Sequence, residues 1–217
     1  MSEFLADAVQ FMPLLLRGLG TTILLTLCAL GLSLMLGMIW ALMALSPSRL
    51  LRVVSVTIVQ TVRGIPIIVQ LFCVYFVLPE FGIDLPPFMA GVVGLGVAYS
   101  VYQAENFRGG FGSVDPQLVE AGLSLGMSNG LAFRRIVFPL GLRTALPSLG
   151  NTTVMLLKDS SIASTITIAE LTRAGQLLAI STFKNETVYL LVALLYLAAS
   201  LPLAALVRLF ERRMART

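Results

Sequence analysis

"LGTTILLTLCALGLSLMLGMIWALMAL" occupies positions Leu19 to Leu45 and contains no charged residue. It exceeds the roughly 20 apolar residues that a helix needs to cross about 30 Å of hydrocarbon. The rest of the chain has the same character, because 57% of its 217 residues are hydrophobic, 12% are charged and the mean hydropathy is +0.92. Soluble domains are much more polar than this. The sequence therefore predicts an all-α, polytopic integral membrane protein.

Further apolar runs predict five transmembrane helices in one domain that covers residues 1–217. They lie near residues 19–45, 53–78, 88–107, 146–168 and 188–209. The third run is rich in glycine, and Gly91, Gly94 and Gly96 indicate close helix packing. The fourth contains "LLKDSSIAS", so hydropathy favours these two runs less and a four-span arrangement stays open. An odd number of spans places the two termini on opposite sides of the membrane.

The placement of basic residues gives the expected orientation, since Lys and Arg gather in cytoplasmic loops. Of the 15 basic residues, 11 fall at alternate connections and at the C-terminal end: Arg49, Arg52, Arg63, Arg108, Arg134, Arg135, Arg143, Arg208, Arg212, Arg213 and Arg216. This clustering at span ends also argues against nucleic-acid binding. The other side has "PEFGIDLPP", with no base, and the leading segment, which we expect to form an amphipathic external helix. We expect the N-terminus outside and the C-terminus in the cytoplasm.

Several kinds of chemistry are absent from the sequence. The chain has no histidine, which excludes a histidine-based catalytic triad and the commonest zinc ligand. It also lacks the G-x-x-x-x-G-K-[ST] loop that binds ATP phosphates. Cys28 and Cys73 fall inside expected spans, where small apolar packing is their simplest role, so no metal site is expected. We therefore expect no enzymatic activity, and uphill transport would need an ion gradient or a second chain.

One connection, "SVDPQLVEAGLSLGMSNGLAFRRIVFP" at residues 113–139, is too polar for a span. Asp115 can cap the free N–H groups of a helix whose first residue, Pro116, has no N–H to satisfy. Ser128 or Asn129 can cap a second helix, which Pro139 would end. The spacing predicts a helix, a turn and a helix on the cytoplasmic side, between the third and fourth spans.

The same connection carries a recognisable pattern of small and charged residues. Gly122, Gly126 and Gly130 are four residues apart, which indicates either close helix contact or turn residues at the end of the first helix. Six positions resemble the EAA signature of ABC importer membrane subunits: Glu120, Ala121, Gly122, Gly126, Ile136 and Pro139. That signature usually has Ala at Gly122 and Leu at Phe138. The resemblance implies a coupling helix at residues 115–139, in which Glu120 and its two small neighbours face a groove of the ATPase subunit.

The resemblance extends from about Gly18 to the end of the chain. "TVRGIPIIVQLF", "YQAENFRGGFGSV" and "IAELTRAGQ" look like the polar amino acid permeases of that superfamily. The resemblance implies a type I importer in the bacterial cytoplasmic (inner) membrane, with five spans per permease. Its partners would be a second permease subunit, identical or related, an extracytoplasmic solute-binding protein and cytoplasmic ATPase subunits that hold ATP and Mg. The solute would be a polar amino acid or a close relative.

Polar residues inside the expected spans are candidates for a solute pathway. Lys158 and Asp159 fall near the centre of the fourth expected span, where a charge costs on the order of 2.5 to 3.5 kcal/mol. They could bind the carboxylate and the ammonium group of a zwitterion, or form a structural ion pair. Glu105 could belong to the inner gate or pair with Arg108 three residues later. Gln70 should face the bundle.

Two further features bear on transport. Gly64 and Pro66 in the second span indicate a bend, which suits an inner gate near the cytoplasmic end. "AELTRAGQLLAISTFKNETV", between the last two spans, could receive the binding protein or be a solvated segment. The competing hypothesis is a self-contained secondary carrier or channel for a small zwitterion. The sequence shows no inverted repeats, which disfavours that class.

Overall fold

The computed structural model describes residues 2–214 and is nearly all helical, with no strand among these residues. The α-helices are α1 (Ser2–Ala44), α2 (Arg49–Gly64), α3 (Ile67–Phe72), α4 (Pro87–Gly112), α5 (Pro116–Ser124), α6 (Asn129–Ala132), α7 (Phe138–Asp159), α8 (Leu171–Thr182) and α9 (Asn185–Met214). The shorter turns are the π-helices η1 (Cys73–Val77) and η3 (Phe133–Val137) and the 3-10 helices η2 (Leu78–Phe81) and η4 (Ser160–Ile166). The prediction of an all-α chain is confirmed.

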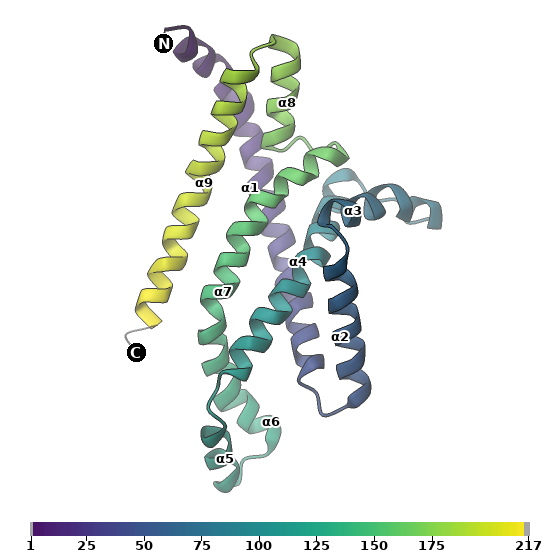
Figure 1. Ribbon diagram of the computed structural model, residues 1–217, viewed down its shortest axis with the longest axis vertical. Helices are drawn as coiled ribbons and strands as arrows, with labels where there is room; N and C mark the ends of the chain where they lie inside the picture. Colours follow the sequence, from purple (N-terminus) through teal and green to yellow (C-terminus); the bar gives the residue numbers. More distant parts are fainter. Residues whose placement is uncertain (1, 215–217) are drawn as a thin grey trace.

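Helix α4 forms the centre of the bundle. It packs most extensively along α1 and next along α7, and α9 packs in turn against α7 and α8. The start of α1, α8 and the start of α9 lie at one end of the bundle, and the α5–α6 hairpin extends from the other end (Figure 1). The segment that could receive the binding protein, which contains α8, and the α5–α6 hairpin, which we expected in the cytoplasm, therefore lie at opposite ends of the molecule.

Glycine allows the central helices to approach one another. A Cβ added to Gly96 would lie 2.6 Å from the Leu32 Cδ2 atom of α1, and one added to Gly37 would lie 2.7 Å from Gln103 Cβ of α4. A Cβ on Gly110 would overlap the backbone of α7. Only glycine fits at such crossings, and small residues are typical of close helix contacts in membranes. The predicted packing role of the glycines in the third expected span is confirmed.

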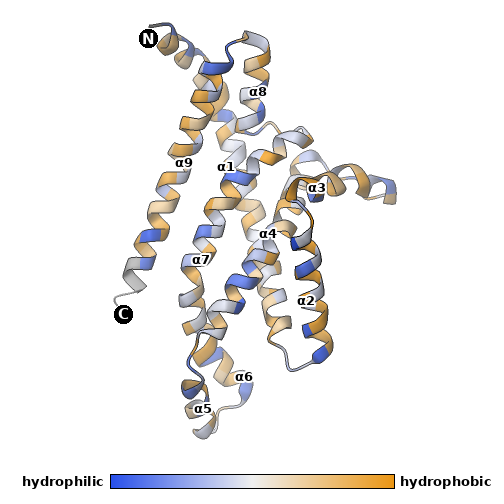
Figure 2. Cartoon of the chain, in the orientation of Figure 1, coloured by the Kyte–Doolittle hydropathy of each residue, from blue (hydrophilic) through white to orange (hydrophobic). Residues whose placement is uncertain are grey.

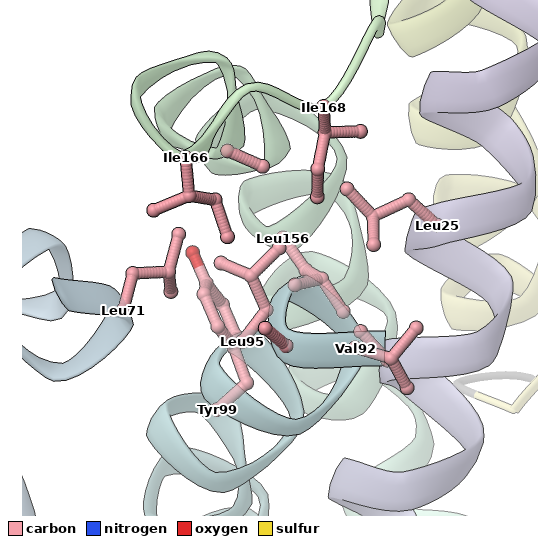
Figure 3. Packing of buried hydrophobic residues seen from close by; sticks show 11 residues of the cluster. Leu25, Leu71, Val92, Leu95, Tyr99, Leu156, Ile166 and Ile168 are labelled. Atoms are coloured by element: carbon pink, nitrogen blue, oxygen red, sulfur yellow. The ribbon is translucent and has the colours of Figure 1, made fainter. Parts of the chain in front are cut away.

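A cluster of buried side chains joins five elements around the middle of the bundle (Figure 3). Leu71 of α3, Leu95 and Tyr99 of α4, Leu156 of α7 and Ile166 of η4 point toward one another, and all are buried. Lipid tails are as apolar as leucine, so such a cluster gains its stability from close packing rather than from removal from water. It fixes the ends of α3 and α7 against α4.

Within the described residues, two helices are long and apolar enough to cross a membrane by length and composition, Glu3–Ala44 and Asn185–Glu211. Figure 2 shows α9 as largely hydrophobic, whereas hydrophilic residues interrupt α4 and α7. Helix α1 has 43 residues, so at 1.5 Å per residue it extends about 64 Å, well beyond the hydrocarbon thickness. The leading segment is therefore a continuation of the first span, and the separate external helix that we expected is not present.

The second expected span is not one continuous helix. Its two parts, Arg49–Gly64 and Ile67–Phe81, meet at an angle of 100° and together would make a third candidate span. Pro66 has no N–H to continue the helix, and it holds Ile65 in an extended conformation, with φ −101° and ψ 129°. The bend predicted from Gly64 and Pro66 is present, but it is a full break.

The fourth expected span also differs from the prediction. Helix α7 begins at Phe138, earlier than expected, and ends at Asp159, after which the chain tightens into η4. Lys158 and Asp159 therefore lie in the last turn of α7, and not at the centre of a helix that continues to residue 168. The chain leaves η4 through Thr167, which has a left-handed φ of 67°.

Candidate functional site

The connection at residues 113–139 forms the expected hairpin. Asp115 Oδ1 accepts a hydrogen bond from the Gln117 N–H at 2.9 Å and caps α5, and Ser128 Oγ accepts one from the Leu131 N–H at 3.4 Å and caps α6. Gly126 has a φ of +87°, which residues with a side chain rarely adopt, so it acts as a turn residue. Both caps follow from the sequence, and Ser128 rather than Asn129 is the second one.

The EAA residues divide into two faces of this hairpin. Glu120 and Ala121 are exposed, whereas Gly122 is buried against η3. A Cβ on Gly122 would lie 2.7 Å from Ile136 Cδ1 and 3.3 Å from the Met127 sulfur. Gly122 therefore holds the hairpin closed, and the expectation that it faces a partner together with Ala121 is wrong.

Proline 139 does not end a helix, contrary to the prediction. The chain runs from α6 through η3 into α7 with helical backbone angles throughout. In η3 the Phe138 N–H donates to the Phe133 carbonyl five residues earlier, which is a π-helical turn. Such a turn offsets the helical register next to a residue that lacks an N–H. The hairpin is consequently continuous with α7.

Aromatic rings connect the hairpin to α4 as well. The Phe111 ring of α4 lies 5.6 Å from the Phe133 ring in an edge-on arrangement and 6.0 Å from the Phe138 ring in a stacked one. Aromatic pairs at these separations favour fixed geometries. The hairpin is therefore packed against α4 as well as joined to α7. This cluster was not predicted from the sequence, although Phe111, Phe133 and Phe138 flank the hairpin.

Asp159 is tied to the centre of the bundle by one hydrogen bond. The Tyr99 hydroxyl of α4 donates to Asp159 Oδ2 at 2.6 Å, and Asp159 is partly exposed. Lys158 is exposed, and among the described side chains it forms no ion pair, either with Asp159 or with another acid. The contacts give no support to a structural Lys158–Asp159 pair, and both charged groups are available to bind a ligand.

The other residues expected in the solute pathway make local contacts. Gln70 Nε2 donates to the carbonyls of Val62 and Ile65, each at 2.8 Å. The Val62 carbonyl also accepts from the Ile65 N–H at 3.3 Å, so Gln70 supplements the hydrogen bonds of the backbone where the helix breaks at Pro66. This is a structural role, and its contacts do not support a place for Gln70 in the solute pathway. The Glu105 carboxylate lies 2.6 Å from Arg108 Nη2. Of the two roles expected for Glu105, this contact supports the pair with Arg108.

The position of the break does not fit an inner gate. It follows a helix of 16 residues, so Pro66 lies about 24 Å from the start of α2, where the expected cytoplasmic loop begins. Helix α3 instead packs against η4, at the end of α7 that carries Asp159. Gly64 and Pro66 therefore lie near the level of the charged residues and not at the cytoplasmic end.

Glu170 is a buried acid to which the sequence analysis gave no role. Its carboxylate caps α8 by accepting hydrogen bonds from the N–H groups of Thr172, at 2.9 Å, and Arg173, at 2.7 Å. Thr22 of α1 and Tyr196 of α9 also donate to it, at 3.3 and 2.7 Å. Burial raises the pKa of the Glu170 carboxyl, and these donors oppose the rise. The sequence signal that could have indicated this capping role is an acidic residue directly before a helix.

A model of the binding-protein-dependent transport system inner membrane component matches residues 33–216, which is most of the chain. The chain belongs to this family. Its members are membrane components of transporters and not enzymes, so the absence of catalytic motifs agrees with the assignment.

Individual relatives of this family member match it along nearly its whole length. The probable amino-acid ABC transporter permease protein y4tG of Sinorhizobium fredii is 33% identical over 95% of this chain and 90% of its own. The glutamine transport system permease protein GlnP of Escherichia coli is 35% identical, with 93% of each chain covered. A chain from the crystal structure of an amino acid ABC transporter with histidines superposes with a TM-score of 0.90, at 36% identity over 96% of this chain and 97% of that one.

Proposed function

We propose that this chain is the permease subunit of an ATP-driven importer that moves a polar amino acid, or a closely related solute, into the cytoplasm. The observation that carries the proposal is the hairpin, which exposes Glu120 and Ala121 and is joined without interruption to α7. A docking element of this kind has no use in a carrier that works alone. Membership in a family of transport components and relatives named as amino acid permeases support the same assignment.

The partners follow from this assignment. Cytoplasmic ATPase subunits, which would hold ATP and Mg, dock on the hairpin around Glu120 and Ala121. A second permease, identical or related, completes the pathway. An extracytoplasmic binding protein delivers the solute to the opposite end, where α8 is fixed by Glu170 to α1 and α9. The chain itself needs no cofactor.

The topology that we propose has five spans, with the N-terminus outside and the C-terminus in the cytoplasm. Helices α1 and α9 are two of them, and the bent pair α2 and α3, α4, and α7 with η4 supply the others. The glycine-mediated contacts of α4 with α1 and α7 support its place inside the bundle, where fewer lipid-facing residues are needed. The α5–α6 hairpin is then cytoplasmic.

The solute contacts that we propose are Asp159 and Lys158. An ammonium group and a carboxylate occur together in every free amino acid, and the two side chains can pair with one each through charge-assisted hydrogen bonds. The Tyr99 hydroxyl holds one Asp159 oxygen, which leaves the second free.

Uptake into proteoliposomes tests the proposal. The permease is reconstituted with its ATPase and binding protein, and labelled amino acids are supplied from the outside of right-side-out vesicles. We expect uptake that stops when ATP is depleted while the ion gradients are clamped. Uptake that continues without ATP and follows an imposed ion gradient would instead establish a secondary carrier.

A further inference from the structure

A cavity of about 340 Å³ lies between the end of α1, α2 and α4, and the transport scheme above does not use it. Its lining is rich in polar and charged groups, among them Arg52, Arg63, Glu105 and Arg108. It is distinct from the solute contacts, since Lys158 and Asp159 are not part of its lining. With the proposed topology, it extends along α2 from Arg52, near the cytoplasmic end, to Arg63, next to the break at Pro66.

The charges in this cavity are not balanced. Glu105 is engaged by Arg108, whose Nη2 and Nε donate to Glu105 Oε2 at 2.6 and 3.2 Å. Among the described side chains, Arg52 and Arg63 make no ion pair. The Arg63 guanidinium lies over the Tyr102 ring, 5.9 Å from its centroid, which orients the group without neutralising it. Two positive charges are therefore available to an anion.

Guanidinium groups favour one kind of anion in particular. Their planar donors match the oxygens of a phosphate in a bidentate arrangement, and the Tyr102 ring orients the Arg63 group here. Basic pockets between helices on the cytoplasmic side of membrane proteins are suited to anionic lipid headgroups. The chemistry of the polar lining therefore points to a phosphate or phosphodiester.

The rest of the lining favours a lipid over a soluble anion. Val56 and Val59 of α2 and Trp40 and Ala41 of α1 form an apolar wall, and Val56 is 49% exposed. The Trp40 indole N–H donates to Ser100 Oγ at 3.3 Å, which fixes its ring, and tryptophan is typical of membrane interfaces. We propose that the cavity binds the headgroup phosphate of an anionic phospholipid of the inner leaflet, with its acyl chains along the apolar flank of α2.

Native mass spectrometry of the permease tests this proposal, because it detects lipids that remain bound after detergent extraction. The protein is reconstituted in nanodiscs with equal amounts of phosphatidylglycerol and phosphatidylcholine and then released. We expect selective retention of phosphatidylglycerol. Arg52→Gln and Arg63→Gln should each lower that retention about tenfold, the effect expected from one charge-assisted hydrogen bond. Arg143→Gln, an exposed arginine of α7 outside the cavity, should leave it unchanged.

Three outcomes would overturn the proposal. Equal retention of phosphatidylcholine would show that the cavity does not select for charge. An equal loss in Arg143→Gln would show that the lipid binds by general surface charge. Calorimetry with inorganic phosphate on the delipidated protein separates the two sources of the anion, since binding as tight as that of phosphatidylglycerol would assign the site to a soluble ion. These measurements require no transport, so they can fail while the proposed function holds.

Discussion

Lys158 and Asp159, which we propose as solute contacts, are charged side chains next to a largely apolar run of residues. A charge in an apolar run is costly and stands out without a structure, which is how Lys158 and Asp159 were identified. The Tyr99 hydroxyl that holds Asp159 comes from another helix, and its reach depends on the crossing of α4 and α7. The carbonyls to which Gln70 donates could not be inferred either, because they come within reach only where the helix breaks.

At this scale the solute hypothesis makes a sharp prediction for Asp159→Asn. The substitution keeps an oxygen that can accept from the Tyr99 hydroxyl but removes the negative charge that would bind the ammonium group of the solute. We expect the initial rate of uptake to fall about tenfold or more. Initial rates in proteoliposomes measure this, with copurification of the ATPase as a check on assembly.

The matched control for that substitution is Asp84→Asn, which changes an exposed aspartate in the connection before α4. It should transport at the normal rate. If Asp159→Asn also transports normally, the carboxylate does not bind the solute. If it instead fails to assemble with the ATPase, the charge has a structural role that its contacts in the isolated chain do not reveal.

The α5–α6 hairpin shows what can be predicted for a single element. Its caps and its turn depend on neighbouring residues only, so Asp115 was correctly placed, and Ser128 and the turn at Gly126 were each one of two alternatives. The path of the chain after the second cap was not correctly predicted. A proline can either end a helix or follow a π-helical turn, and tertiary packing decides which of the two occurs. The burial of Gly122 against Ile136 likewise could not be predicted. The four-residue spacing of the glycines is the same whether Gly122 faces the rest of the hairpin or a partner.

The two faces of the hairpin predict two different kinds of defect. Glu120→Lys reverses an exposed charge, so it should leave thermal unfolding of the permease unchanged while the ATPase no longer copurifies or no longer responds to the loaded binding protein. Gly122→Leu forces a side chain into Ile136 and should lower the unfolding temperature, with overpacking costing about 1 to 3 kcal/mol. Thermal unfolding and solute-stimulated ATPase activity measure both effects.

Gly130→Ala provides the control for this pair, because a Cβ there meets no atom within 4 Å and the position is exposed. It should be normal in both assays. Intact ATPase stimulation and pull-down in Glu120→Lys would contradict the docking assignment. An unfolding temperature in Gly122→Leu equal to that of the unmodified protein would show that the hairpin can open without loss of stability.

For the whole molecule, composition predicts a membrane protein, and the glycines of α4 predict its close contacts with other helices. The ends of the spans were predicted less accurately. Hydropathy measures how well a helix suits lipid, so it identifies α1 and α9 directly. It is a poor guide to α4, whose surface is largely covered by other helices and need not be as apolar, and to α7, in which hydrophilic residues interrupt the apolar run. The break at Pro66 was visible as a bend, although its 100° angle depends on packing.

The proposed topology predicts which ends of the molecule can be reached from each side of the membrane. With Cys28 and Cys73 replaced by Ser, single cysteines are introduced as Asp84→Cys and Gln117→Cys, both at exposed positions. A membrane-impermeant maleimide should label the first in intact spheroplasts and the second only after permeabilisation. The reason is the alternation of sides: Asp84 lies in the acidic connection before α4, whereas Gln117 lies in the basic connection after it, so one crossing separates them. Labelling of both cysteines in intact spheroplasts would mean that α4 does not cross the membrane, and the four-span arrangement would then replace the five-span one.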